Sequence, residues 1–134
     1  MADLRSQALR SRDRGYAPYS HFRVGAAVLT ADGSIFAGCN VENASYGLSI
    51  CAERVAVFQA VAAGHTSITA IAVATDLVPP AAPCGACRQV LHEFGPDVRI
   101  IAVNADGDHW EAGLDELLPR SFGPDDLTRG AYTA

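Results

Sequence analysis

Three cysteines in this chain have the type and spacing of metal or redox ligands. Cys84 and Cys87 form a C-x-x-C motif, and Cys51 stands two residues before Glu53. A single C-x-x-C motif is compatible with a thioredoxin-like redox role and with part of a zinc site. Cys51 favours zinc, because Cys51 and Cys84 both begin stretches with a helical pattern, which places three thiols at two helix N-termini. We therefore expect Cys51, Cys84 and Cys87 to bind one Zn²⁺ ion.

The fourth cysteine, Cys39, decides whether such a zinc site is catalytic or structural. A catalytic site has three protein ligands and one open position, whereas a structural site has four ligands. Cys39 lies at the end of a predicted strand and belongs to no C-x-x-C motif. We expect it to be a small buried side chain. A closed site of four cysteines, in a non-catalytic structural zinc module, is the alternative that the residues leave open.

Glu53 adds acid–base chemistry to the expected metal site. A carboxylate on the first turn of a helix contributes only about 0.3–1 kcal/mol through its charge. Two residues after a metal-binding thiolate, it can also reach a water at the metal without binding the ion, so we expect Glu53 to act as a general acid and base. Three thiolates exceed the charge of Zn²⁺ by one. We expect Arg54 to compensate this charge, with Arg88 as a second candidate.

The elements that must position these residues form an α/β pattern. Turn residues and hydrophobic periodicity predict the following elements: helices over residues 4–14, 49–63, 85–94 and 114–118, and strands over residues 23–30, 35–40, 69–75, 99–103 and 109–111. The apolar strand 69–75 indicates a sheet that is covered on both faces. We expect a three-layer α/β/α sandwich with a mixed sheet of about five strands. It would form a single domain over residues 1–134, with a C-terminal tail from about residue 119.

Composition and charge exclude several other classes of protein. The 134 residues are 49% hydrophobic, which excludes disorder as the main state. The net charge is −5 and all ten basic residues are Arg without a basic run, so we expect no nucleic-acid partner. The chain has neither a membrane-spanning apolar segment nor a secretory pattern at its start. We expect no membrane contact and a cytoplasmic location, where thiols stay reduced.

The motifs around the cysteines resemble one known family. Cys51-Ala52-Glu53-Arg54 and residues 83–89 (Pro-Cys-Gly-Ala-Cys-Arg-Gln) are similar to the small homotetrameric cytidine deaminases. The resemblance extends over about residues 16–127 and includes four further segments: residues 16–20, 22–27, 38–43 and 116–119. The resemblance implies a cytidine deaminase-like fold and a zinc-dependent hydrolytic enzyme with one zinc ion per subunit. Its reaction would convert cytidine and 2′-deoxycytidine to uridine and 2′-deoxyuridine plus ammonia, in pyrimidine salvage.

The resemblance also assigns substrate contacts within one subunit. It implies that Asn40 and Glu42 bind the ribose hydroxyls and that Phe22 packs against the nucleoside. A flat base needs such an apolar wall, and a polyhydroxylated ring needs donors and acceptors. The backbone N–H of Ala52 would hold the base. Glu53 would protonate N3 of the base before ammonia leaves.

A neighbouring subunit completes the site that the resemblance implies. Phe122, in the predicted tail, and Tyr46 would both enter the site of a neighbouring subunit, so the homotetramer would have shared active sites. An exposed Phe in such a tail is unusual for a monomer. The nearest enzymatic alternative is a blasticidin S type deaminase, which shares the zinc motifs. The ribose motif at residues 40–43 favours the ordinary nucleoside.

Overall fold

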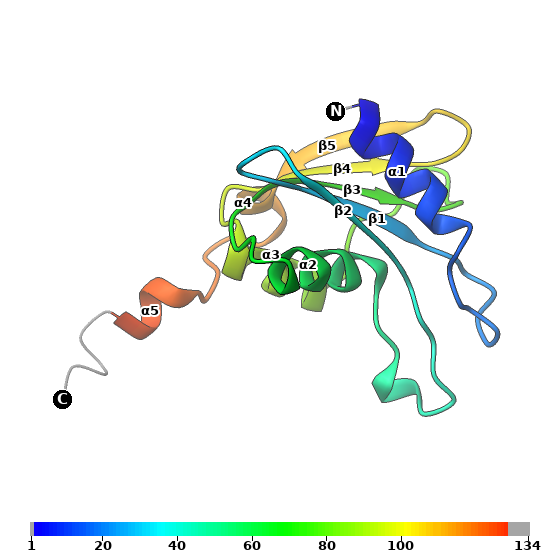
Figure 1. Ribbon diagram of the computed structural model, residues 1–134, viewed down its shortest axis with the longest axis horizontal. Helices are drawn as coiled ribbons and strands as arrows, with labels where there is room; N and C mark the ends of the chain where they lie inside the picture. Colours follow the sequence, from blue (N-terminus) through cyan, green and yellow to red (C-terminus); the bar gives the residue numbers. More distant parts are fainter. Residues whose placement is uncertain (1, 129–134) are drawn as a thin grey trace.

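A five-stranded mixed sheet forms the middle layer of the computed structural model, which describes residues 2–128 (Figure 1). The strands lie in the order β2-β1-β3-β4-β5. Their bounds are Gly25–Thr30 (β1), Ile35–Cys39 (β2), Ile68–Ala74 (β3), Arg99–Val103 (β4) and His109–Gly113 (β5). β3 and β4 are parallel, and every other neighbouring pair in the sheet is antiparallel. The mixed five-stranded sheet confirms the prediction from the sequence. Residue 1 and residues 129–134 of the predicted domain lie outside the described residues.

Helices cover both faces of this sheet (Figure 1). α1 (Ala2–Arg12) packs on one face, mainly against β1 and β3, while α2 (Ala52–Ala62) and α3 (Gly85–Phe94) lie together on the other. β2-α2-β3 and β3-α3-β4 both connect strands that point the same way, and both cross the sheet in the same direction. Because such crossovers are right-handed, both helices must lie on the same face. The three-layer α/β/α arrangement is thereby confirmed.

β3 is buried on both faces, as its apolar sequence predicted. Ile71 and Val73 point into the core on the side of α2 and α3. Ala70 and Ala72, which alternate with them, point into the core under α1. Side chains on a strand alternate between the two faces, so a strand in the middle layer has no polar face. The core on each side of the sheet thus holds β3 in place, and β3 ends at the site described below.

Most predicted elements differ from the observed ones by one to three residues at an end, and two of these differences have a direct structural reason. Ile50 forms a bridge with Val41, so α2 begins at Ala52 and not at residue 49. It ends at Ala62, one residue before the predicted end, and Gly64 follows with a φ of +94°, a conformation that favours glycine. β5 continues to Gly113, two residues past the predicted end of this strand, because residues 112 and 113 pair with β4.

Three short helical segments complete the described chain. A 3₁₀ turn, η1 (Tyr46–Leu48), lies in the long connection before α2, and α4 (Leu114–Leu117) follows β5 directly. A helix, α5 (Pro124–Thr128), lies in the segment that the sequence predicted as a C-terminal tail. α5 extends away from the sheet (Figure 1). Within residues 2–128, no helix has the length and apolar character needed to cross a membrane.

Candidate active site

The N-termini of α2 and α3 bring three thiols together. Cys51 is the residue immediately before α2, Cys84 is the residue immediately before α3, and Cys87 lies in the first turn of α3. Because β2 and β3 point the same way, the helices that follow them begin at the same edge of the sheet. The Sγ atoms of Cys51 and Cys84 are 4.0 Å apart, and those of Cys84 and Cys87 are 3.4 Å apart. The structure thus brings together the three ligands predicted from the sequence.

The sulfur positions fit a tetrahedral zinc ion. Zn–S bonds of about 2.3 Å at tetrahedral angles separate the sulfurs by about 3.8 Å, and the two distances above bracket this value. All three Sγ atoms lie within 4.8 Å of one another, and this is the single such group of possible ligands within residues 2–128. Cys39 is outside the group, at the end of β2. The described residues therefore do not form the closed site of four cysteines that was the structural alternative.

The electrostatics at the thiols favour a metal-binding form. The pKa of Cys51 is lowered to about 5, mainly by hydrogen bonding to the Cys87 thiol. Burial acts in the opposite direction, and Arg54 lowers the pKa further. The Arg54 guanidinium donates to the Cys51 sulfur at 3.4 Å, and the thiolate raises the pKa of Arg54. Arg54 therefore contacts one of the thiolates whose charge we expect it to compensate. Cys87 is the buried thiol of the group, and hydrogen bonding to Cys51 raises its pKa.

Arg88, the second candidate for charge compensation, has a different contact set. Its Nε donates to the carbonyl of Pro83 at 2.8 Å, and its Nη1 donates to the carbonyl of Leu117 at 2.7 Å. The side chain thus joins the loop before Cys84 to the end of α4. Arg88 therefore fixes the position of the loop before Cys84 through two backbone carbonyls.

Glu53 is a buried carboxyl group beside the thiols. It lies on the first turn of α2 and is only 5% exposed. Burial raises the pKa of Glu53 to about 7. A group with a pKa near neutral pH can take up and release a proton under physiological conditions, which is the property of an effective general acid and base. The position and the environment of Glu53 both suit the proton transfer predicted from the sequence.

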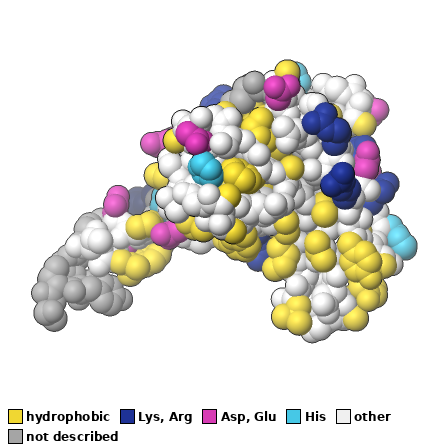
Figure 2. All heavy atoms as spheres, in the orientation of Figure 1, with side chains coloured by type: hydrophobic (Ala, Val, Ile, Leu, Met, Phe, Trp, Pro, Cys, Tyr) yellow, Lys and Arg dark blue, Asp and Glu magenta, His cyan; other side chains and the backbone are white. Residues whose placement is uncertain are grey.

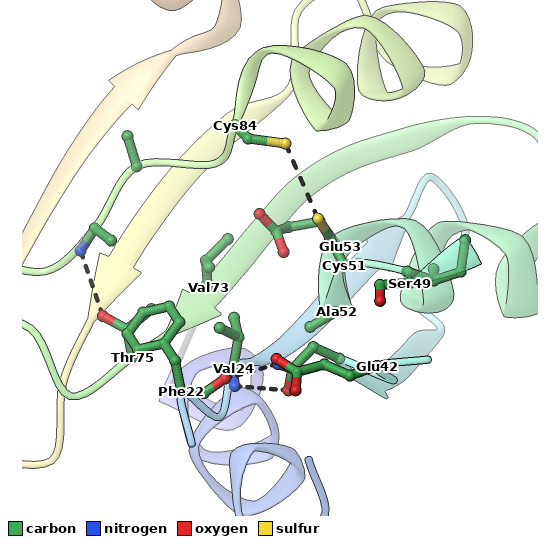
Figure 3. A pocket seen from close by; sticks show the side chains of 14 residues that line it. Phe22, Val24, Glu42, Ser49, Cys51, Ala52, Glu53, Val73, Thr75 and Cys84 are labelled. Carbon is green, nitrogen blue, oxygen red and sulfur yellow. Dashed lines mark hydrogen bonds between the residues drawn. The ribbon is translucent and has the colours of Figure 1, made fainter. Parts of the chain in front are cut away.

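A pocket of about 260 Å³ opens above Glu53 and the thiols (Figure 3). Its walls come from the segment before β1, the end of β2, the N-terminus of α2, the end of β3 and the loop before α3. The lining includes four of the predicted substrate-binding residues: Phe22, Asn40, Glu42 and Ala52. It also includes Ser49, Val73, Thr75, Ala81 and Ala82, which the sequence analysis did not single out. Thr75 could have been predicted as a pocket residue from the sequence. It is a polar residue directly after a buried strand, and ligands of α/β sheets bind at the carboxyl ends of such strands.

Asn40 and Glu42 make structural hydrogen bonds in addition to lining the pocket. The Asn40 side chain accepts the N–H of Val24 at 2.9 Å and donates to the carbonyl of Phe22 at 2.7 Å. Glu42 accepts the N–H groups of Tyr19 and Ser20 at 3.0 and 3.1 Å, and it also accepts the Ser20 hydroxyl. The Ser20 hydroxyl lowers the pKa of Glu42, which therefore stays ionised. Both residues order the segment that carries Phe22.

Tyr46 and Phe122 lie outside the pocket of their own chain. Tyr46 is 74% exposed on η1 and pairs with Tyr19 at a ring-centroid distance of 6.0 Å. Phe122 is 60% exposed in the tail, where its carbonyl accepts the Gln89 side chain at 2.8 Å. Neither side chain is part of its own core. Their role in a neighbouring subunit stays a prediction.

Comparison with known proteins identifies the family. Residues 2–103 match the family model described as the cytidine and deoxycytidylate deaminase zinc-binding region, so the chain belongs to this family. It is 48% identical over 125 residues to a cytidine deaminase of Halalkalibacterium halodurans, covering 92% of this chain and 95% of that protein. A cytidine deaminase of Sporosarcina psychrophila is 44% identical over 129 residues, with 96% and 95% covered. The family and the three thiols define a zinc-dependent hydrolytic deaminase.

Solved structures agree with this assignment. The crystal structure of cytidine deaminase from Burkholderia pseudomallei superposes with a TM-score of 0.87 at 50% identity, covering 90% of this chain and 98% of that chain. The crystal structure of cytidine deaminase from Mycobacterium tuberculosis has a TM-score of 0.77 at 38% identity, with 91% and 96% covered. The resemblance drawn from the sequence motifs is confirmed.

Proposed function

We propose that this protein catalyses the hydrolytic deamination of cytidine and 2′-deoxycytidine to uridine and 2′-deoxyuridine plus ammonia, as a step of pyrimidine salvage. The observation that carries the proposal is the buried carboxyl of Glu53 beside the thiols of Cys51, Cys84 and Cys87, where Glu53, Cys51 and Cys84 line one pocket. The names of its close relatives support cytidine as the substrate.

Cys51, Cys84 and Cys87 would hold the zinc ion, and Arg54 would balance their charge. When bound, zinc lowers the pKa of water and so supplies hydroxide at neutral pH. In our proposal Glu53 accepts the proton of the attacking water and delivers it to N3 of the base. A second proton passes through Glu53 to the amino group, which leaves as ammonia while the C4 carbonyl of the product forms.

The residues around Glu53 would hold the nucleoside for this reaction. Ala52 is the first residue of α2, so its N–H has no acceptor within the helix and is free to donate to the base. Phe22 supplies an apolar wall. Asn40 and Glu42 would bind the ribose hydroxyls. Their side chains can make further hydrogen bonds in addition to those with the backbone. Fixing the base in this way brings the reacting atoms together.

We further infer a homotetramer in which a neighbouring subunit closes the pocket with Phe122 and Tyr46. Hydrophobic side chains gather on the protruding segment that carries η1, at the lower right of Figure 2. Exposed apolar residues of this segment and its surroundings are Tyr16, Tyr19, Phe22, Val41, Tyr46 and Leu48. Contiguous apolar surface of this kind supports a contact with another subunit. A cytoplasmic location would keep the three thiols reduced.

The proposal is tested by offering the purified zinc-loaded protein cytidine, 2′-deoxycytidine and blasticidin S in parallel. Ammonia release and the ultraviolet change of the base report deamination. We expect turnover of both nucleosides and a much lower kcat/KM for blasticidin S. Preference for blasticidin S would replace our proposal with the antibiotic deaminase, and no turnover of any of the three would refute it.

A further inference from the structure

The loop of residues 76–83 forms one wall of the active-site pocket. It connects β3 to α3, and its residues Ala81 and Ala82 line the pocket directly before the metal ligand Cys84. These two side chains are single methyl groups. The shape of this wall is therefore set by where the loop backbone lies and not by long side chains.

The two ends of the loop are held by Thr75, which lines the pocket, and by Arg88, which follows the metal ligand Cys87. The Thr75 hydroxyl accepts the N–H of Leu77 at 3.3 Å and the N–H of Ala81 at 3.4 Å. At the other end, Arg88 donates to the carbonyl of Pro83 at 2.8 Å. This second contact fixes the backbone next to Cys84 independently of the rest of the loop.

The middle of the loop is held from outside the site. The indole Nε1–H of Trp110, on β5, donates to the carbonyl of Pro80 at 2.7 Å. Asn104, directly after β4, donates through Nδ2 to the carbonyl of Leu77 at 3.1 Å. Neither donor lines the pocket. Residues 76–79 add little burial to hold the loop, because Leu77 is 48% exposed and Val78 is 69% exposed, whereas Pro80 and Pro83 are buried.

We propose that Trp110 is a positioning residue for substrate binding: its indole N–H holds the Pro80 carbonyl and thereby the pocket wall formed by Ala81 and Ala82. Without this bond the loop would spend part of its time away from the pocket. The apparent affinity for the nucleoside would then fall in proportion to the fraction of molecules whose loop forms the pocket wall. The chemical step would be affected less, because α2 carries Glu53 and Arg88 holds the backbone before Cys84. The inference rests on the proposed function, in which this pocket binds the nucleoside.

Trp110→Phe tests the proposal, because it keeps an aromatic ring against the core and removes the donor. We expect the KM for cytidine to rise about 3- to 10-fold, the range for one neutral hydrogen bond, with kcat within about twofold of wild type. The Kd of uridine, the product, should rise by a similar factor in titration calorimetry. Zinc content should be unchanged.

A second variant disturbs the other donor. Asn104 also pairs with Asp108 through Nδ2, at 3.0 Å. The double variant N104D/D108N preserves that pair with its direction reversed and leaves the Leu77 carbonyl without its donor. It should raise the KM in the same direction as Trp110→Phe, and it reports on the loop even where replacement of Trp110 impairs folding.

The control is Phe36→Leu, on the opposite edge of the sheet. Phe36 and Trp110 are both half-buried aromatic residues packed against the same core cluster, but Phe36 does not contact the loop. Phe36→Leu should lower the Tm and leave the KM unchanged. An unchanged KM and uridine Kd in Trp110→Phe, or an equal rise in KM in Phe36→Leu, would overturn the role of Trp110. Wild-type protein that leaves cytidine intact would instead refute the proposed function.

Discussion

The Glu53 carboxyl lies in the first turn of α2, and burial raises its pKa to about 7. Gln has nearly the same shape but cannot exchange a proton. Glu53→Gln should therefore keep the zinc ion and the fold while lowering kcat by about 10²–10⁴-fold, the usual contribution of a positioned acid and base. Steady-state kinetics and metal analysis on one preparation check this. Near-normal kcat in a zinc-loaded variant would contradict the proton-transfer role.

The contribution of the Glu42 charge to the stability of the fold can be tested by changing the pH. The Ser20 hydroxyl holds the pKa of Glu42 below its usual 4.5, so the folded state favours the carboxylate. A lowered pKa stabilises the fold above about pH 4.5, and this contribution is lost as pH falls through the lowered value. Glu42→Gln should therefore have a lower Tm than wild type at pH 7, with a gap that narrows below pH 4.5.

The control for this titration is Glu111→Gln, which removes an exposed carboxylate from β5. Thermal unfolding of both variants and the wild type across pH 3.5 to 7 gives the comparison. At pH 7 the gap between Glu42→Gln and wild type should exceed the gap between Glu111→Gln and wild type. A constant difference in Tm between Glu42→Gln and wild type over the whole range would show that the charge of Glu42 is not what stabilises this segment.

At the scale of elements, α2 must lie close to β2 for Glu53 to face the pocket. Gly38 allows this approach, because a Cβ atom there would lie 2.6 Å from the backbone nitrogen of Ala56 and 2.9 Å from Cβ of Val55. Gly38→Ala should lower the free energy of unfolding by about 1–3 kcal/mol through overpacking. Denaturant unfolding measures it. Gly47→Ala is the control, since its Cβ would meet nothing within 4 Å; equal stability of the two variants would contradict the account.

The sequence predicted most elements because their signals were local. The helix over residues 85–94 and the strand over residues 99–103 have the predicted bounds, since Gly95-Pro96 separates them clearly. The start of α2 was misplaced because the pairing of Ile50 with Val41 is a tertiary contact. α5 has only five residues, too few for a periodic pattern, although Pro124 followed by two acidic residues is a helix-start signal.

The sequence predicted those site residues that belong to short sequence motifs. Cys51, Glu53 and the C-x-x-C motif were found because thiolate and carboxylate chemistry depends on their residue types. The hydrogen bond from Trp110 to Pro80 was not predictable, because it joins residues 30 positions apart through a backbone carbonyl. The bond from Arg88 to Leu117 spans 29 positions in the same way. Only the fold brings such partners together.

At the scale of the whole molecule, the exposed Phe122 side chain is the basis of our proposal that a neighbouring subunit completes the site. Because Phe122 is 60% exposed, its removal should cost its own subunit little stability. Phe122→Ala should mainly raise the KM and leave the zinc content unchanged, because the lost contact would be with substrate in a neighbouring site. Steady-state kinetics with metal analysis measures both. A large loss of Tm at unchanged KM would instead place Phe122 in its own core.

Mixing subunits tests the shared site directly. Glu53→Gln subunits carry an intact Phe122, and Phe122→Ala subunits carry an intact Glu53. Under conditions that allow subunit exchange, mixed oligomers should contain some sites with both intact residues, and kcat/KM should rise above that of either variant alone. No recovery in oligomers shown by mass spectrometry to be mixed would contradict a site built from two subunits.

The central claim is that zinc held by Cys51, Cys84 and Cys87 drives the deamination of cytidine. The most direct measurement is zinc content together with ammonia release from cytidine, compared among wild type, Cys84→Ala and Cys39→Ala. We expect one zinc ion per subunit and full activity in wild type and Cys39→Ala. Cys84→Ala should lose the metal, the activity and some stability, because the ion joins the N-termini of α2 and α3. Zinc retained with wild-type activity in Cys84→Ala, or lost in Cys39→Ala, would contradict it.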